Sequence, residues 1–411
     1  MRHPGVARSH EQASWRRGLP AGGESHQTSR TVSAATTAPA IDALETQALT
    51  ASFWFDSGRG RESSSATVRF SGRRIGVIGP PGRGDAFVQE ETIEGIVPLS
   101  GPVSITTRVY GINPGEWKVN AELVAPGPQR REQRRHQQGV RRGGQAIYPA
   151  AWSWRRWALS TGTAQRIKTT LPPLAGFAGM PAVVPGSWVG LVTLGGLVGL
   201  ASQVSLMAYG HVDVHRGLTA SALALLTGLL GAKLWYLALN HWKWRGSTRD
   251  GLCIQGFLLG AVVGGAAALA TLHLPIGTFL DATSPGLFLG LAIGRLGCFL
   301  TGCCAGRATA SRWSVWSSDR RVGARRIPTQ LLESVIAAAL ALTGWLLYMH
   351  LQIAIPGSLF VGSFAAYTLC RQFLLRLRVE PRKSSIGGPL TAEMAALVLF
   401  ADVAWWISAA H

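Results

Sequence analysis

The sequence is poor in acidic residues and in cysteine. Of its 411 residues, 21 are Asp or Glu and 40 are Lys or Arg, and charged residues make up 15% of the chain. Apolar residues make up 47%, which excludes a wholly disordered chain, and the length excludes a single small soluble domain. The five cysteines all lie beyond residue 250, which argues against the disulfide framework of a small secreted protein.

The net charge of +19 is unusual for a chain with so many apolar residues. A soluble nucleic-acid-binding protein spreads its basic residues over one face of a folded domain. In the second half of this sequence, long apolar blocks contain few charges, and the basic residues lie in the gaps between them. This pattern argues against a nucleic-acid partner and indicates a membrane protein whose basic residues meet anionic lipid.

Seven apolar blocks are long enough to cross a bilayer, which takes about 20 residues each. A buried soluble core can explain one or two such blocks, but seven in succession favour an all-α membrane bundle. The blocks are rich in Gly, Ala and Leu, and small residues let helices approach closely in lipid. The predicted spans are Trp188–Met207, Gly217–Asn240, Gly251–His273, Pro285–Cys304, Leu331–His350, Ile355–Leu375 and Gly388–Ser408.

The chain before the spans predicts three segments. Residues 1–48 have no periodicity and are predicted to be a disordered basic tail, with no apolar stretch of a cleavable signal peptide near its start. In residues 49–125, apolar and polar residues alternate between turn motifs, which predicts a small β-sandwich-like domain. Residues 126–187 are a basic linker with Trp and Pro, which suits a membrane interface and equally a solvated linker. Residues 188–411 then form the seven-helix membrane domain.

The most informative segment is residues 294–309. It reads Gly-Arg-Leu-Gly-Cys-Phe-Leu-Thr-Gly-Cys-Cys-Ala-Gly-Arg-Ala-Thr. Arg295 lies in or at the end of an apolar span, where an ionisable residue is a functional candidate by default. Its planar guanidinium can hold two oxygens of a lipid phosphate. The alternative is an arginine that only extends its charge to the membrane interface.

This segment resembles the signature of the prolipoprotein diacylglyceryl transferase family. The signature reads Gly-Arg-x-Gly-Asn-Phe-x-Asn-Gly-Glu-x-x-Gly-Arg-x-Thr, and the sequence agrees with it at Gly294, Arg295, Gly297, Phe299, Gly302, Gly306, Arg307 and Thr309. Four further landmarks resemble family motifs and follow in the family's order: Gly231–Tyr236, Asp281 with Pro285, Pro328–Glu333 and Arg371–Arg378. The resemblance covers about residues 188–408.

The resemblance implies a seven-helix protein of the bacterial cytoplasmic (inner) membrane. Its implied activity is transfer of diacylglyceryl from phosphatidylglycerol to the lipobox cysteine thiol of a prolipoprotein. The implied partners are phosphatidylglycerol and the prolipoprotein signal peptide, and no cofactor is implied.

The predicted catalytic residues are Arg295, Arg378 and Gln255, of which the two arginines would hold the phosphate and stabilise the departing glycerol phosphate. The predicted substrate-binding residues are Arg295, Arg307, Gly297, Thr301, Gln330, Glu333, Tyr236 and Asp281. Gln330 and Glu333 equally suit a structural role at a helix start.

The sequence departs from the family pattern at residues that handle protons. Gln255 stands where the family has His, and a neutral amide cannot act as a general base at neutral pH. The other departures are Cys298, Thr301, Cys303, Ile327 and Leu375, in place of Asn, Asn, Glu, His and an acidic residue. Three explanations stay open: another group deprotonates the thiol, the substrate differs, or activity is lost. The alternative function is a non-catalytic or altered-substrate relative that binds anionic lipid and docks an unknown partner through the β-domain.

Two groups of potential metal ligands occur in the second half of the chain. Cys298, Cys303 and Cys304 suit a soft-metal or thiol site, but two adjacent cysteines do not easily face one ion, so adaptable packing residues are favoured. His211 and His215 have metal-like spacing, but they fall in a short loop without a third strong ligand nearby. No metal site is predicted.

The basic residues predict an orientation that conflicts with the family. They concentrate in the gaps after the second, fourth and sixth predicted spans, and Arg216 is the only Lys or Arg in the gaps after the first, third and fifth. The positive-inside rule therefore places the N-terminus in the cytoplasm, whereas the resemblance implies that it lies outside. A basic active-site face for an anionic substrate would give the same pattern, so the orientation stays open.

Overall fold

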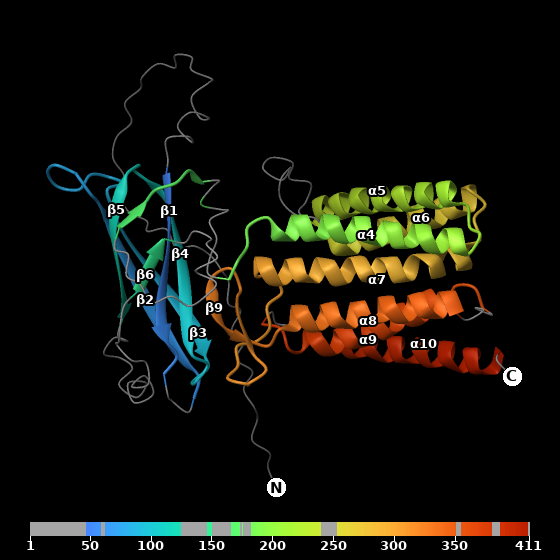
Figure 1. The fold of residues 1–411 in the computed structure, drawn as a ribbon. Helices are drawn as coiled ribbons and strands as arrows, with labels where there is room; N and C mark the ends of the chain where they lie inside the picture. The colour runs from blue at the N-terminus through green and yellow to red at the C-terminus, as the bar shows by residue number, and fades with distance from the viewer. Residues whose placement is uncertain are drawn as a thin grey trace, which may run out of the picture. The chain divides into compact units, whose positions relative to one another are not determined.

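The structure is a computed structural model that describes residues 47–58, 62–124, 146–149, 166–172, 175, 182–239, 253–350, 355–379 and 387–409. The predicted disordered tail lies almost entirely outside the described residues, as does most of the predicted linker. In the described part, a β region with two antiparallel sheets precedes seven long apolar helices (Figure 1). The predicted fold class, a membrane helix bundle preceded by a β-sandwich-like region, is confirmed.

Two antiparallel sheets form the β region. The first has the strand order β6-β1-β4-β9-β8, and the second has the order β3-β2-β5-β7. The strands are β1 Gln47–Asp56, β2 Ser64–Arg74, β3 Ala86–Ile96, β4 Pro102–Ile112, β5 Glu116–Val124, β6 Ala146–Pro149, β7 Arg166–Lys168, β8 Val315–Ser318 and β9 Val322–Arg326. β2 pairs with β3, the strand that follows it in the chain, whereas β1 pairs with β4, so the chain passes from one sheet to the other after β1 and returns after β3.

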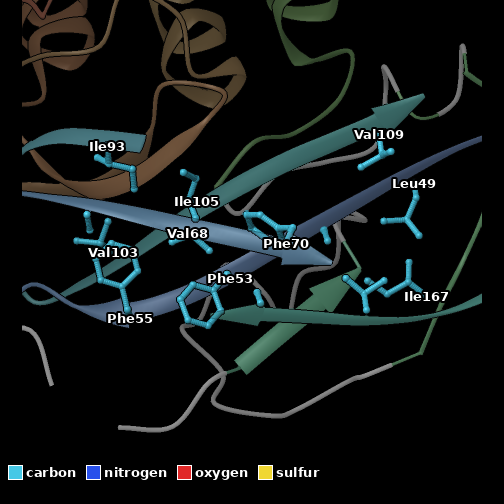
Figure 2. Close-up of a cluster of buried hydrophobic side chains, with 14 of the residues drawn as sticks. Leu49, Phe53, Phe55, Val68, Phe70, Ile93, Val103, Ile105, Val109 and Ile167 are labelled. Carbon is cyan, nitrogen blue, oxygen red and sulfur yellow. The ribbon is translucent and has the colours of Figure 1, made fainter. Parts of the chain in front are cut away.

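The two sheets enclose an apolar core (Figure 2). Phe53 from β1, Phe70 from β2 and Trp117 from β5 are fully buried in it. In β2 and β5, buried residues alternate with more exposed ones, as expected when one face of a sheet covers a core. The alternation of apolar and polar residues in the sequence is therefore explained by the packing of the two sheets against one core.

The first sheet includes a hairpin from the second half of the chain, made of β8 and β9. β9 pairs with β4, where Ser104 lies opposite Gly323. Trp316 of β8 stacks on Trp54 with ring centres 5.1 Å apart, and its indole N–H donates to the carbonyl oxygen of Pro102 at 3.1 Å. Strands of four and five residues carry too short an alternation to be recognised in a sequence, so this hairpin was not predicted.

Within the described residues, seven helices are long and apolar enough to cross a membrane. They are α4 Ser187–Tyr209, α5 Val214–Leu239, α6 Ile254–Thr271, α7 Ile276–Thr301, α8 Thr329–His350, α9 Ser358–Leu375 and α10 Gly387–Ala409. Each coincides with one predicted span. The largest difference is at α7, which begins at Ile276 rather than at Pro285, so that the proline lies inside the helix.

Asp281 explains why the start of α7 was placed too late. Its buried carboxylate accepts hydrogen bonds from the backbone N–H groups of Gly357 at 2.6 Å and Phe360 at 2.9 Å. These N–H groups belong to the first turn of α9, where they have no partner within their own helix. Asp281 therefore caps a neighbouring helix, and its charge is compensated inside the protein although it interrupts the apolar pattern of the sequence.

Helices α4 and α7 pack through glycines. A methyl group added at Gly199 would lie 2.6 Å from the carbonyl oxygen of Gly286, and one added at Gly195 would lie 2.5 Å from that of Gly290. Such contacts leave no room for a larger side chain and are typical of close helix packing in lipid. On the same helix, a methyl group added at Gly196 meets open space.

The substitution Gly199→Val is therefore expected to lower the free energy of unfolding by about 1–3 kcal/mol, because the new side chain pushes α4 away from α7. Gly196→Val adds the same side chain to the same helix and is expected to have little effect. Thermal unfolding of both purified variants in detergent measures the difference. Equal unfolding temperatures would contradict a tight α4–α7 contact.

Candidate active site

Glu333 is the centre of a buried charge cluster where α7 ends and α8 begins. Its side chain is 1% exposed. Its Oε1 atom accepts hydrogen bonds from the Tyr367 hydroxyl at 2.7 Å and from Arg371, and lies 2.9 Å from Nη2 of Arg295. Its Oε2 atom accepts from Nη2 of Arg378 at 2.6 Å. One carboxylate thus faces three guanidinium groups, and we call these five residues the Glu333 cluster.

Three arginines around one carboxylate leave the Glu333 cluster with two unbalanced positive charges. The side chains of Arg295 and Arg378 are only 13% and 7% exposed. The Nε–H group of each is buried and has no hydrogen-bond partner among the described residues. Buried charges and buried donors without partners are unfavourable. The cluster therefore has unused capacity for an anion with several acceptor oxygens, such as a phosphate.

Arg378 lies just after α9 and is held by the loop that follows α7. Its backbone forms an antiparallel bridge with Gly306. The backbone N–H of Arg307 donates to the carbonyl oxygen of Leu377 at 2.9 Å, and Nε of Arg307 donates to that of Arg378 at 3.2 Å. The signature segment thereby fixes the backbone from which Arg378 reaches Glu333.

Three cysteines lie beside the arginines. The sulfur of Cys298 is 4.0 Å from Nη1 of Arg295, and the thiol of Cys303 donates to the carbonyl oxygen of Cys298 at 3.7 Å. The neighbouring Cys298 and Cys303 thiols lower the pKa of Cys304, and the positive charges of Arg378 and Arg295 lower it further. Hydrogen bonds to the other two cysteines raise the pKa of Cys303. The three thiols thus form one connected group with unequal acidity.

The sequence contains two groups of potential metal ligands, the three cysteines and the pair His211 and His215. Among the residues that the structure describes, no three His, Cys, Asp or Glu side chains are placed so that they could hold one metal ion. Asp213, between the two histidines of the short loop, instead accepts a hydrogen bond from the backbone N–H of Arg216 at 3.0 Å. This contact caps the start of α5, which gives the loop a structural role.

A family model described as prolipoprotein diacylglyceryl transferase matches residues 183–408, more than half of the chain. The chain belongs to the prolipoprotein diacylglyceryl transferase family. It is 29% identical over 205 residues to the phosphatidylglycerol–prolipoprotein diacylglyceryl transferase of Dehalococcoides mccartyi, a match that covers 47% of this chain and 78% of the relative. It is 28% identical over 238 residues to phosphatidylglycerol–prolipoprotein diacylglyceryl transferase 2 of Clostridium perfringens, covering 53% of this chain and 91% of the relative.

The family match confirms the predicted resemblance, and the β region before residue 183 lies outside it. Of the residues predicted from the resemblance, Arg295, Arg378 and Glu333 converge in the Glu333 cluster, and Arg307 supports the backbone of Arg378. These residues come from three separate landmarks of the sequence. The structure therefore brings together charged residues from three of the five family motifs.

Three other predicted substrate-binding residues have structural partners close to the cluster. Gln330 Nε2 donates to the carbonyl oxygen of Cys303 at 2.8 Å, which ties the loop after α7 to the start of α8. The Thr301 hydroxyl lies 3.0 Å from the Ser187 hydroxyl and joins the end of α7 to the start of α4. A methyl group added at Gly297 would lie 3.1 Å from a backbone carbon of α4. These contacts shape the end of the bundle at which the cluster lies.

The remaining predicted site residues lie on other parts of the bundle. Tyr236 is near the end of α5, where Nζ of Lys233 lies 5.6 Å from its ring centre. Gln255 is exposed in the first turn of α6. Asp281 lies 14 residues before Arg295 on α7, which corresponds to about 21 Å along a helix. The Glu333 cluster is formed instead by α7, α8, α9 and the segment after α9.

Tyr367 and Arg371 belong to the cluster but were not predicted as site residues. They lie one turn apart on α9, and both donate to Glu333. Nη1 of Arg371 also lies 3.2 Å from the Tyr367 hydroxyl. The sequence carries a signal for the pair, because two polar residues four positions apart in an apolar span share one helix face.

Proposed function

We propose that this protein transfers the diacylglyceryl group of phosphatidylglycerol to the lipobox cysteine thiol of prolipoproteins in the bacterial cytoplasmic membrane. The observation that carries the proposal is the pair of buried Nε–H groups without partners, on Arg295 and Arg378, within a cluster that has two unbalanced positive charges. A phosphodiester has the negative charge and the free oxygens that these groups require. Membership of the transferase family supports the same substrate.

The proposed reaction forms one bond and breaks one bond at the lipid. The lipobox thiolate attacks the glyceryl carbon that is bonded to the phosphate, a carbon–sulfur bond forms, and the carbon–oxygen bond breaks. Glycerol phosphate leaves with the electron pair and gains a second negative charge. Arg295 and Arg378 therefore bind the leaving group more strongly in the transition state than in the lipid, which accelerates the reaction. Glu333 holds both guanidinium groups in the required direction.

The proposal is tested with the purified protein in phosphatidylglycerol vesicles and a lipobox peptide. Mass spectrometry is expected to show one diacylglyceryl group added to the cysteine. A peptide with Ser in place of the lipobox Cys and vesicles of phosphatidylcholine alone serve as controls and are expected to give no product. If the protein binds phosphatidylglycerol without modifying any peptide, the transferase proposal is wrong. That result would favour a non-catalytic relative that binds anionic lipid and docks a partner through its β region.

A further inference from the structure

The loop between α7 and α8, residues 302–328, carries an excess of positive charge outside the Glu333 cluster. It contains six arginines and one acidic residue, Asp319. Asp319 pairs with Arg326 at 2.7 Å, and Arg321 pairs with a glutamate of β3 at 2.6 Å. Arg312 takes part in neither pair, and it is exposed. The acidic groups that meet this loop are therefore engaged by other arginines, and Arg312 is available to an anion from outside the chain.

Arg312 lies beside an exposed aromatic residue, Trp313. Trp313 has 75% of its surface exposed, which is unusual for so large an apolar side chain. The Arg312 guanidinium carbon lies 5.0 Å from the centre of the Trp313 ring, a cation–π contact. A guanidinium has five N–H groups, so contact with a ring leaves donors for acceptor oxygens. The pair therefore combines an apolar ring and a cation with free donors at one place on the surface.

The turn that carries this pair is held in place by hydrogen bonds. The backbone N–H of Trp313 donates to the Ser311 hydroxyl at 3.3 Å, and the Ser314 hydroxyl donates to the carbonyl oxygen of Ser311 at 2.6 Å. Both ends of the turn bind Arg325 of β9. The backbone N–H of Thr309 donates to the carbonyl oxygen of Arg325 at 2.9 Å, and Nη2 of Arg325 donates to that of Ser314 at 3.5 Å. The exposure of Trp313 is therefore a property of an ordered turn.

The turn lies close to the level at which the spans leave the membrane. Arg325 precedes the start of α8 at Thr329 by four residues, which reach at most about 13 Å when extended. At the end of α7, Nε of Arg320 donates to the carbonyl oxygen of Thr301 at 3.2 Å. Arg320 is exposed, as is Arg376 at the end of α9, so other cations lie at the ends of two spans. The turn is thus within reach of lipid headgroups, on a positively charged side of the bundle.

We propose that Arg312 and Trp313 form a binding site for the headgroup of an anionic phospholipid at the membrane surface. The guanidinium donates to the phosphate oxygens, and the indole ring lies at the headgroup level, where Trp is enriched in membrane proteins. A lipid fits better than a soluble anion, because the site joins a cation to an apolar ring that water solvates poorly. Neither residue belongs to the Glu333 cluster, so the inference goes beyond the proposed transfer and does not depend on it.

Bromine-labelled lipids test this site, because a bromine atom on an acyl chain quenches the fluorescence of a nearby tryptophan. The full-length protein is reconstituted in phosphatidylcholine vesicles that contain an equal minor fraction of bromine-labelled phosphatidylglycerol or of bromine-labelled phosphatidylcholine. The emission of Trp313 is obtained as the difference between the parent and Trp313→Phe. Quenching is expected to show about fivefold tighter binding of phosphatidylglycerol than of phosphatidylcholine, which is the effect of one arginine close to an anionic lipid.

Two changes are expected to remove this preference. In the parent, about 1 M NaCl shortens the screening length to about 3 Å and is expected to make the two lipids quench Trp313 almost equally. Arg312→Gln keeps Trp313 and is expected to have the same effect at low salt. Arg73→Gln removes an exposed arginine of β2 and is the matched control, expected to keep the fivefold preference.

Three results would overturn the site. They are absence of Trp313 quenching by either lipid, equal quenching by both lipids in the parent at low salt, and a preference that survives Arg312→Gln. An equal loss of preference in Arg73→Gln would show an effect of total charge and would also exclude a specific site. No lipobox peptide is present in these measurements, so their outcome is separate from the success or failure of the transferase proposal.

Discussion

Glu333→Gln is expected to lower the free energy of unfolding by about 3–5 kcal/mol and to abolish transfer, because it leaves three guanidinium groups around a neutral amide. Glu333 is 1% exposed, so water cannot replace the lost carboxylate without opening the bundle. Gln has nearly the volume of Glu, so the loss of stability would result from the missing charge and not from altered packing. Thermal unfolding in detergent free of phosphatidylglycerol measures the stability, and the peptide assay measures the activity.

Two further variants identify the cause of that loss. Glu333→Asp keeps the charge but shortens the side chain, and it is expected to destabilise the protein less than Gln does. Arg371 is the most exposed of the three arginines, with 34% of its side chain accessible, so Arg371→Gln removes one repelling charge at small cost in packing. Glu333→Gln combined with Arg371→Gln should therefore be more stable than Glu333→Gln alone. A less stable double variant would rule out repulsion between the arginines as the cause.

The seven spans were predictable because a helix in lipid must be apolar along most of its length. The same criterion placed the start of α7 too late, since it treats Asp281 as an uncompensated charge, whereas the first turn of α9 binds it. The family motifs identified Arg295, Arg378 and Glu333 one at a time. Their common geometry arises only where three helices meet, and no spacing along the chain expresses it.

The orientation could not be decided from the sequence because the distribution of Lys and Arg and the family resemblance indicate opposite orientations. In the loop after α7, Arg326 pairs with Asp319 at 2.7 Å, and Arg321 pairs with Glu91 of β3 at 2.6 Å. The latter contact accompanies the pairing of β9 with β4, which joins parts of the chain more than 200 residues apart. These arginines therefore have structural roles in the folded loop, which a count of Lys and Arg along the sequence does not reveal.

Arg378→Lys is expected to lower kcat/KM for phosphatidylglycerol about 100-fold although it preserves the charge. Nη2 of Arg378 is bound to Glu333, which leaves the buried Nε–H among the groups that can bind a phosphate oxygen. A lysine has one nitrogen, which cannot hold Glu333 and the phosphate in the fixed directions of a guanidinium. Arg295→Lys is expected to behave in the same way. The peptide assay at several mole fractions of phosphatidylglycerol measures both variants.

Arg216→Lys is the matched control, because Arg216 pairs with Asp213 at 3.5 Å at the exposed start of α5 and is expected to tolerate the change without loss of activity. The double variant Arg295→Lys/Arg378→Lys tests whether both arginines act on one phosphate. Residues that bind a shared group are not additive, so the double variant should lose less than the product of the two single losses. A loss equal to that product would mean that the two arginines bind separate groups, and a single shared phosphate would then be wrong.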